Sequence, residues 1–133
     1  MKLKLIQSEA YRNATPEERA KICNGCGAKG MIDFVPDKFG DFDMTEACNI
    51  HDWDYHHAKP NDDEKHRQDR KFLWNLVILA LKLGISHLSK RLRICLAYYD
   101  AVSAFGHPAF WANKERPKTD VGKVVQEDYP PQT

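Results

Sequence analysis

Hydrophobic residues recur at helical spacing along the second half of the chain. In residues 61–83 they lie three or four positions apart, and Asn-Asp-Asp-Glu at the start and Gly84 at the end mark the limits of one predicted helix. A second apolar stripe predicts a helix over residues 86–105, capped by Gly106, with inner positions Leu88, Leu92, Cys95, Tyr99 and Val102. The pattern therefore predicts two long helices joined by a short turn.

Two further helices are predicted from start and stop signals. Residues 15–18 (Thr-Pro-Glu-Glu) combine a capping box with proline at the first helical position, and this helix should end near Cys23. Residues 43–46 (Asp-Met-Thr-Glu) begin another helix that should run to about Ala58. Between these helices, residues 24–43 contain several glycines and a proline, which predict an irregular loop.

These elements predict an all-α, mainly helical fold. We expect one domain over residues 1–106, because a chain of 133 residues is long enough for a single hydrophobic core. Residues 107–133 are polar and contain prolines, so we expect a C-terminal extension that packs on this domain or frays from it. Within the extension, Phe110 and Trp111 are expected to pack back on the domain.

Charge and hydropathy limit the partners. The net charge is +1, which gives no reason to expect nucleic acid. The longest apolar run, residues 76–81, is far shorter than a membrane span. The N-terminus lacks the long apolar segment of a signal peptide, so the chain stays inside the cell, leaves by another route or has lost a signal. We expect a monomer. The basic residues Lys90, Arg91 and Arg93 are expected to form a solvated face, with contact to anionic headgroups as the alternative.

The cysteines leave the redox state open. An even number permits two disulfides with three possible connectivities among Cys23, Cys26, Cys48 and Cys95. The missing signal peptide argues instead for free thiols.

The residues that carry chemistry are concentrated between Cys48 and Tyr55. His51 and Asp52 are adjacent there and would point about 100° apart on a helix, so each can contact a different group. The short connection after this helix makes it an antiparallel neighbour of the next one, which brings Asp69 level with His51. A carboxylate that accepts the imidazole N–H would make His51 a general base acting on water. The alternative is an ordinary surface pair on a helix.

Asp52 has the properties of a calcium ligand. Calcium prefers carboxylate and carbonyl oxygens, and the glycine-rich loop of residues 24–30 can turn several carbonyls inward. A disulfide between Cys26 and Cys48, one of the pairings left open above, would clamp this loop beside His51 and Asp52.

The chain resembles the secreted phospholipase A2 superfamily, most of all its short bacterial and fungal type. The resemblance is carried by residues 47–55 (Ala-Cys-Asn-Ile-His-Asp-Trp-Asp-Tyr) and by the upstream Asn-Gly-Cys-Gly of residues 24–27. Two further matches come in the same order: Asp69 followed by Phe72, and residues 98–106 (Tyr-Tyr-Asp-Ala-Val-Ser-Ala-Phe-Gly).

The resemblance implies calcium-dependent hydrolysis of the sn-2 ester of glycerophospholipids at a membrane surface. It implies that His51 activates water, that Asp69 is its partner and that Asp100 is the alternative partner. It further implies a calcium site formed by one carboxylate and by mostly backbone oxygens of the loop, at Asp52, Asn24, Gly25 and Gly27. Residues 31–37 lengthen the loop relative to the compact bacterial type, and the role of residues 31–42 is open.

Two other functions compete with this interpretation. Cys23, Cys26, Cys48 and His51 have the spacing of a structural Cys3His zinc module, although this leaves the two aspartates without a role. The fold could also serve as a phospholipase-like binding or toxin module without activity. A His-Asp metal phosphohydrolase needs a further histidine upstream, and all other histidines lie downstream of His51.

Overall fold

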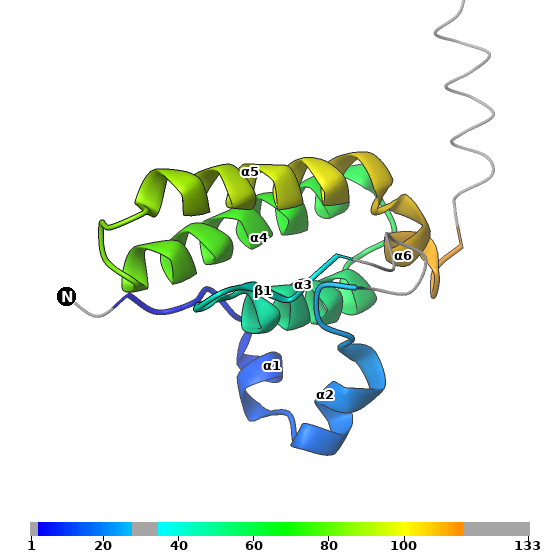
Figure 1. The fold of residues 1–133 in the computed structure, drawn as a ribbon. Coiled ribbons are helices and arrows are strands. Elements are labelled where there is room, and N and C mark those ends of the chain that lie inside the picture. The colour runs from blue at the N-terminus through cyan, green and yellow to red at the C-terminus, as the bar shows by residue number, and fades with distance from the viewer. Residues whose placement is uncertain (1–2, 28–34, 116–133) are drawn as a thin grey trace, which may run out of the picture.

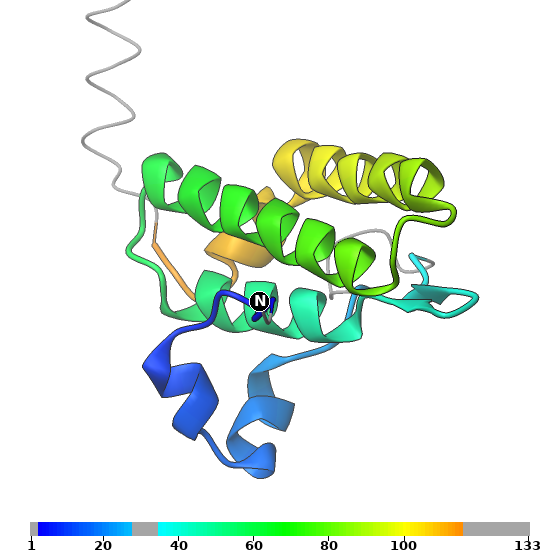
Figure 2. The ribbon, with the colours of Figure 1, turned by 90° about the vertical axis from the view of Figure 1, so that its left-hand side faces the viewer.

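Two long antiparallel helices lie side by side and form one layer of the molecule (Figure 1). The computed structural model describes residues 3–27 and 35–115. The third long helix lies beneath this layer, and two short N-terminal helices lie beneath that (Figures 1 and 2). The elements are, in chain order, α1 Glu9–Asn13, α2 Pro16–Ile22, β1 Lys38–Phe39, β2 Phe42–Asp43, α3 Thr45–His57, α4 Asp62–Lys82, α5 Leu88–Phe105 and α6 His107–Trp111.

The mainly helical fold confirms the prediction from the sequence, and the helix ends follow the expected signals. Thr15 and Glu18 form the reciprocal capping box at the start of α2. The side chain of Asn61 accepts the backbone N–H of Glu64 at 2.8 Å and caps α4. Contacts between α3 and α4 run in opposite chain directions, because Tyr55 lies against Lys65 near the start of α4, whereas His51 stacks on Phe72 further along α4.

The three shortest features were not predicted. The loop expected over residues 24–43 contains an antiparallel hairpin, in which Phe39 pairs with Phe42 across a turn at Gly40. Strands of two residues are too short to show an alternating pattern. Helices α1 and α6 have five residues each, which is also too short for a periodic signal.

Helix α3 is buried on two opposite faces. Ala47 and Cys48 pack into the larger cluster with α4 and α5, whereas Ile50 and Trp53 pack against Tyr11 of the N-terminal layer. A helix buried on both sides has apolar residues around most of its circumference. The two clusters therefore fix α3 in place between the layers.

The extension expected after residue 106 begins as part of the packed domain. Phe110 in α6 is fully buried and contacts Tyr55 edge-on, with ring centroids 5.2 Å apart. The expected packing of this residue is therefore confirmed, and residues 116–133 lie outside the described part of the chain. Within the described residues, no helix combines the length and hydrophobicity needed to cross a membrane.

The basic cluster at the start of α5, which consists of Lys90, Arg91 and Arg93, differs in part from the expected solvated face. Arg91 is only 7 % exposed, and its guanidinium donates to the carbonyls of Ala80, Gly84 and Ser86 at 3.1, 2.5 and 2.8 Å. It therefore closes the turn between α4 and α5, while Lys90 and Arg93 remain exposed as expected. The spacing contains the signal that was missed, because Arg91 lies three residues after Leu88 and four before Cys95, on the side of the predicted inner stripe, whereas Lys90 and Arg93 lie on the opposite side.

Candidate active site

A buried histidine–aspartate pair joins α3 to α4. His51 is 4 % exposed, and its Nε2 lies 2.9 Å from Oδ1 of the fully buried Asp69. An aspartate oxygen at this position takes the N–H of the ring and leaves Nδ1 as the basic nitrogen. Among the described residues, Nδ1 has no hydrogen-bond partner. The pairing expected from the sequence is therefore present, and the exposed Asp100 on α5 does not take this place.

Two further donors reach the same carboxylate. The hydroxyl of Tyr55 donates to Asp69 Oδ1 at 2.5 Å, and the Nζ of the fully buried Lys65 lies 2.7 Å from Oδ2. Burial alone would raise the pKa of the Asp69 carboxyl, but the hydrogen bonds with His51, Lys65 and Tyr55 and the charge of His51 bring it below its ordinary value. Asp69 therefore stays ionised.

The bonds from Lys65 and Tyr55 to Asp69 were not predicted from the sequence. The lysine lies four residues before Asp69, a common spacing for exposed helix pairs, and nothing in the pattern distinguishes a buried pair. Its ammonium also donates to the carbonyl of Val102 at 3.0 Å, so it connects α4 to α5. Burial, and the charge of Asp69 beside it, raise the pKa of the Tyr55 phenol, which remains a neutral donor.

Asp52 faces the glycine-containing loop, one position along α3 from His51. Its Oδ2 accepts the backbone N–H of Asn24 at 2.8 Å. Burial raises the pKa of the Asp52 carboxyl to about 7, against the opposing effect of the Asn24 hydrogen bond, and the charge of Asp37 raises it further. A half-buried carboxylate that has no cationic partner among the described residues is typical of a site that gains stability by binding a cation.

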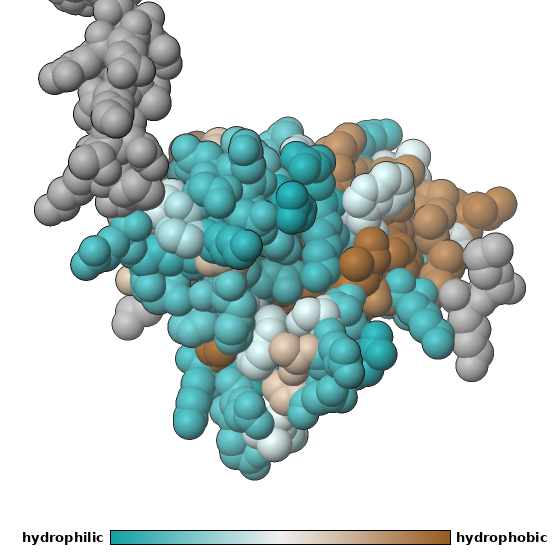
Figure 3. All heavy atoms as spheres, turned by 180° about the vertical axis from the view of Figure 1, so that it is seen from behind, coloured by the Kyte–Doolittle hydropathy of each residue, from teal (hydrophilic) through white to brown (hydrophobic). Residues whose placement is uncertain are grey.

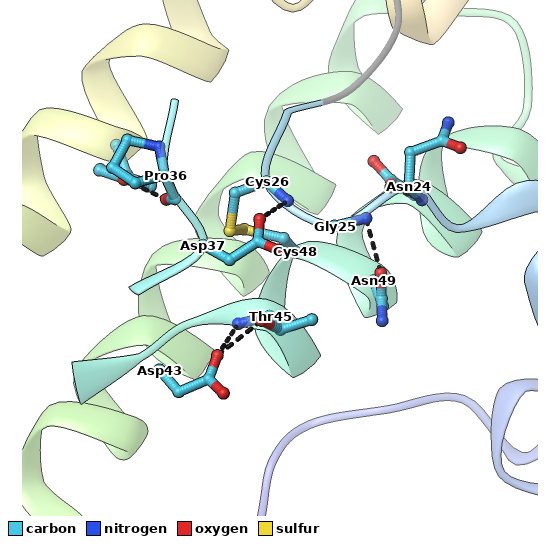
Figure 4. The surroundings of a disulfide bond; sticks show 11 residues. Asn24, Gly25, Cys26, Pro36, Asp37, Asp43, Thr45, Cys48 and Asn49 are labelled. Atoms are coloured by element: carbon cyan, nitrogen blue, oxygen red, sulfur yellow. Dashed lines mark hydrogen bonds between the residues drawn. A yellow bond between two sulfur atoms is a disulfide. The ribbon is translucent and has the colours of Figure 1, made fainter. Parts of the chain in front are cut away.

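The loop is held by a disulfide and by a second carboxylate (Figure 4). Cys26 and Cys48 are joined, which is one of the pairings left open by the sequence, while Cys23 and Cys95 are free thiols. Asp37 Oδ1 accepts the backbone N–H of Cys26 at 2.8 Å. Gly25 has φ +69°, and an added Cβ would lie 3.0 Å from both carboxylate oxygens of Asp37, so this position requires glycine. Asp37 was missed because it lies eleven residues from its partner in an irregular segment.

The residues present fit a calcium site in part. The carboxylates of Asp52 and Asp37 and the carbonyl oxygens of residues 24–26 are the hard oxygen donors that calcium takes. The backbone N–H groups of Asn24, Gly25 and Cys26 are bonded to side-chain oxygens, and no described group donates to the carbonyls of these three residues. Gly27, the last predicted ligand, is the final described residue before the gap at 28–34, so the expected loop is described only up to this residue.

An apolar cavity of about 230 Å³ opens beside the histidine. His51, Asp52 and the two disulfide-bonded cysteines, Cys26 and Cys48, form part of its wall. The remaining wall comes mostly from the hairpin segment and α5, at Val35, Pro36, Phe39, Phe72, Ala97, Tyr98, Ala101 and Val102. Such a wall accepts a hydrocarbon chain and excludes water from the buried base.

The proposed zinc module does not form. Two of its sulfurs are bonded to each other, the thiol of Cys23 donates to the carbonyl of Asn49 at 3.3 Å, and His51 Nε2 is directed at Asp69. Burial raises the pKa of the Cys23 thiol to about 11, which disfavours the thiolate that zinc requires. Within residues 3–27 and 35–115, no cluster of three or more side chains of the metal-binding types is present.

Comparison with protein-family models, with curated proteins and with solved structures found no match to this chain. The interpretation of the site therefore rests on its geometry.

Gly106 is expected to tolerate no side chain. This gives a test of the packing around Tyr55, which donates to Asp69 of the His51–Asp69 pair. A Cβ there would overlap the carbonyl oxygen of Val102 and would lie 2.6 Å from the Tyr55 hydroxyl. Gly106→Ala should therefore lower the free energy of unfolding by about 1–3 kcal/mol in urea denaturation. Ala104→Ser, which also adds one heavy atom but at an exposed position, is the control. Equal stability of Gly106→Ala and wild type would show that the end of α5 moves freely.

Proposed function

We propose that this protein is a calcium-dependent phospholipase A2-like hydrolase that cleaves the sn-2 ester of glycerophospholipids. The observation that supports the proposal most is a buried His51–Asp69 pair, opening on an apolar cavity, with the carboxylate of Asp52 at the cavity wall. A base, a site for a cation and a slot for a hydrocarbon chain are the three parts that such a hydrolysis needs.

The chain's own residues supply the proton transfers. The carboxylate of Asp69 holds the N–H of His51 on Nε2, so Nδ1 can take a proton from a water molecule as its oxygen attacks the ester carbonyl. The imidazolium so formed is stabilised by Asp69 and returns the proton to the leaving alkoxide when the acyl C–O bond breaks. The products are a free fatty acid and a lysophospholipid, and no acyl-enzyme is formed.

Asp52, with Asp37 and the carbonyls of Asn24 and Gly25, would hold the calcium ion. When bound, calcium supplies positive charge that polarises the ester carbonyl. The disulfide keeps the loop close to α3, so the carboxylate of Asp52 and the base of His51 face the same cavity. The apolar wall orients the acyl chain so that its ester reaches the base.

Release of fatty acid from phospholipid vesicles tests the proposal. We expect release with calcium, none with a chelator, and a loss of at least about 100-fold in His51→Ala, because a positioned base contributes 10²–10⁴-fold. Asp52→Asn should lose the response to calcium. A substrate with different acyl chains at sn-1 and sn-2 identifies the bond that is cleaved.

Matched controls separate chemistry from folding. His66→Ala and Asp63→Asn make the same substitutions as the two site variants, but at exposed positions on α4, and should keep wild-type release of fatty acid. Circular dichroism should show that all four variants remain helical. Absence of calcium-dependent release by the wild type, or equal release by His51→Ala, would refute the catalytic proposal and favour a binding module on the same scaffold.

A further inference from the structure

The turn between α4 and α5 exposes apolar residues at one end of the molecule. Ile85 is 87 % exposed, and Leu81 and Leu83 beside it are 41 % and 38 % exposed. Apolar surface gathers at this end when the molecule is viewed from behind (Figure 3). We call residues 81–85 the α4–α5 tip. An apolar side chain this exposed is not explained by the packing of the domain.

The backbone of the tip has little need of water. Arg91 satisfies the carbonyls of Ala80, Gly84 and Ser86. The carbonyls of Leu81 and Ile85 accept the backbone N–H groups of Gly84 and Leu88 at 3.0 and 3.1 Å. An exposed turn usually leaves its carbonyls to water, and an unsatisfied carbonyl is costly in an apolar medium. This turn can therefore leave water with most of its carbonyls already paired.

Along the chain on both sides of the tip, the charged residues have one sign. Between Asp69 and Asp100 the chain contains six lysines and arginines and no acidic residue. Lys82 within the tip and Lys90 shortly after it are exposed, as is Arg93 one turn further along α5, and none of them forms an ion pair within the described part of the chain. Lys82 also shares a surface hollow with Lys4 and Arg12 of the N-terminal segment. Such a cationic rim is complementary to anionic lipid headgroups.

From these three features we propose that the α4–α5 tip is a docking element for anionic phospholipid bilayers. The aliphatic side chains of the tip enter the boundary between headgroups and acyl chains, and Lys82 and Lys90 contact lipid phosphates. The guanidinium of Arg91 keeps the turn in one shape, so little conformational entropy is lost on docking. The inference rests on the proposed function in that both take a phospholipid bilayer as the partner, but docking requires neither His51 nor calcium.

Flotation with vesicles tests the tip without catalysis. The full chain is mixed, in the presence of a calcium chelator, with vesicles of phosphatidylcholine alone or mixed with phosphatidylglycerol. We expect binding to the mixed vesicles, roughly 10–100-fold weaker binding by Ile85→Asp, because one aliphatic side chain no longer leaves water, and loss of roughly fivefold per lysine in Lys82→Gln/Lys90→Gln. Phe105→Asp, at the other end of α5, changes a residue that is 60 % exposed and should bind as wild type.

Each remaining outcome contradicts the inference. The tip is not the docking element if the wild type binds neither kind of vesicle, or if Ile85→Asp and Phe105→Asp bind equally well. Self-association in sedimentation without lipid, abolished by Ile85→Asp, would assign the tip to a second copy of the chain. Hydrolysis of a dispersed short-chain phospholipid, measured on the same proteins, reports separately on the proposed function and should be unchanged in Ile85→Asp.

Discussion

Replacing Asp69 by asparagine is expected to lower the free energy of unfolding by about 3–5 kcal/mol. The carboxylate is fully buried and accepts from His51, Tyr55 and Lys65 at 2.9, 2.5 and 2.7 Å. An amide removes the negative charge and leaves the ammonium of Lys65 buried with only backbone carbonyls as partners. It also places an N–H₂ donor among three donors. Urea denaturation followed by circular dichroism measures the loss.

A double-mutant cycle shows whether the unpaired charge causes this loss. Lys65→Met removes the ammonium and keeps the aliphatic stem, so Asp69→Asn in the Lys65→Met background should cost clearly less than in the wild type. Additive costs of the two changes would mean that the ion pair contributes nothing to folding. Arg67→Met, which breaks an exposed pair with Glu64 on the same helix, is the control and should change stability by less than about 1 kcal/mol.

The loss of stability at acid pH follows from protonation of Asp69. The folded-state pKa of Asp69 lies below its ordinary value, so its stabilising contribution is complete above the unfolded value of about 4 and is lost as the pH falls through the folded value. The wild type should therefore lose stability below about pH 4 more steeply than Asp69→Asn.

Removal of the Cys26–Cys48 disulfide is expected to cost about 3 kcal/mol of folding free energy. The two cysteines are 22 positions apart, and the chain-entropy model gives this value for a loop of that size. Because the disulfide also holds the loop against α3, Cys26→Ala/Cys48→Ala should in addition lose the proposed calcium-dependent activity. Thermal unfolding and fatty acid release measure the two effects.

The free thiols provide the controls for this experiment. Cys23→Ala changes the half-buried thiol next to the same loop without opening a disulfide, and it should lose much less stability. A reducing agent should lower the unfolding midpoint of the wild type and leave that of Cys26→Ala/Cys48→Ala unchanged. A wild type that is insensitive to reduction would show that the loop is held by Asp37 and Asn49 alone.

The strongest elements of the fold could be predicted because each carries a local signal. The helix around His51 and the helix around Asp69 are bounded by capping residues and joined by a short turn, so their antiparallel pairing follows from the sequence. The pairing of His51 with Asp69 follows from that geometry. The assignment of Asp52 and the loop to calcium remains a prediction, which fatty acid release with calcium and with a chelator tests.

The residues whose structural roles could not be predicted make contacts with residues that are distant in the sequence. Lys65 and Arg91 occupy inner helical positions, but charged side chains are rarely buried, so both are expected in solvent. Both are buried because backbone carbonyls that helix ends and turns leave without partners lie within their reach. Asp37 belongs to the same class, since its partners on the loop are brought near only by the hairpin and the disulfide.

The position of α3 between two packed layers has a consequence for how the protein can diverge. Ile50 and Trp53 are fixed by one layer and Ala47 and Cys48 by the other, so almost every change in α3 disturbs a core or the site. Much of the cavity wall comes from side chains before and within the hairpin and from α5, at Val35, Pro36, Phe39, Ala97, Tyr98, Ala101 and Val102, and none of these has a role in the proposed reaction. Under the proposed function, selection for a different lipid can therefore act on these side chains while the reacting groups stay the same, so specificity and reactivity would evolve in separate parts of the chain.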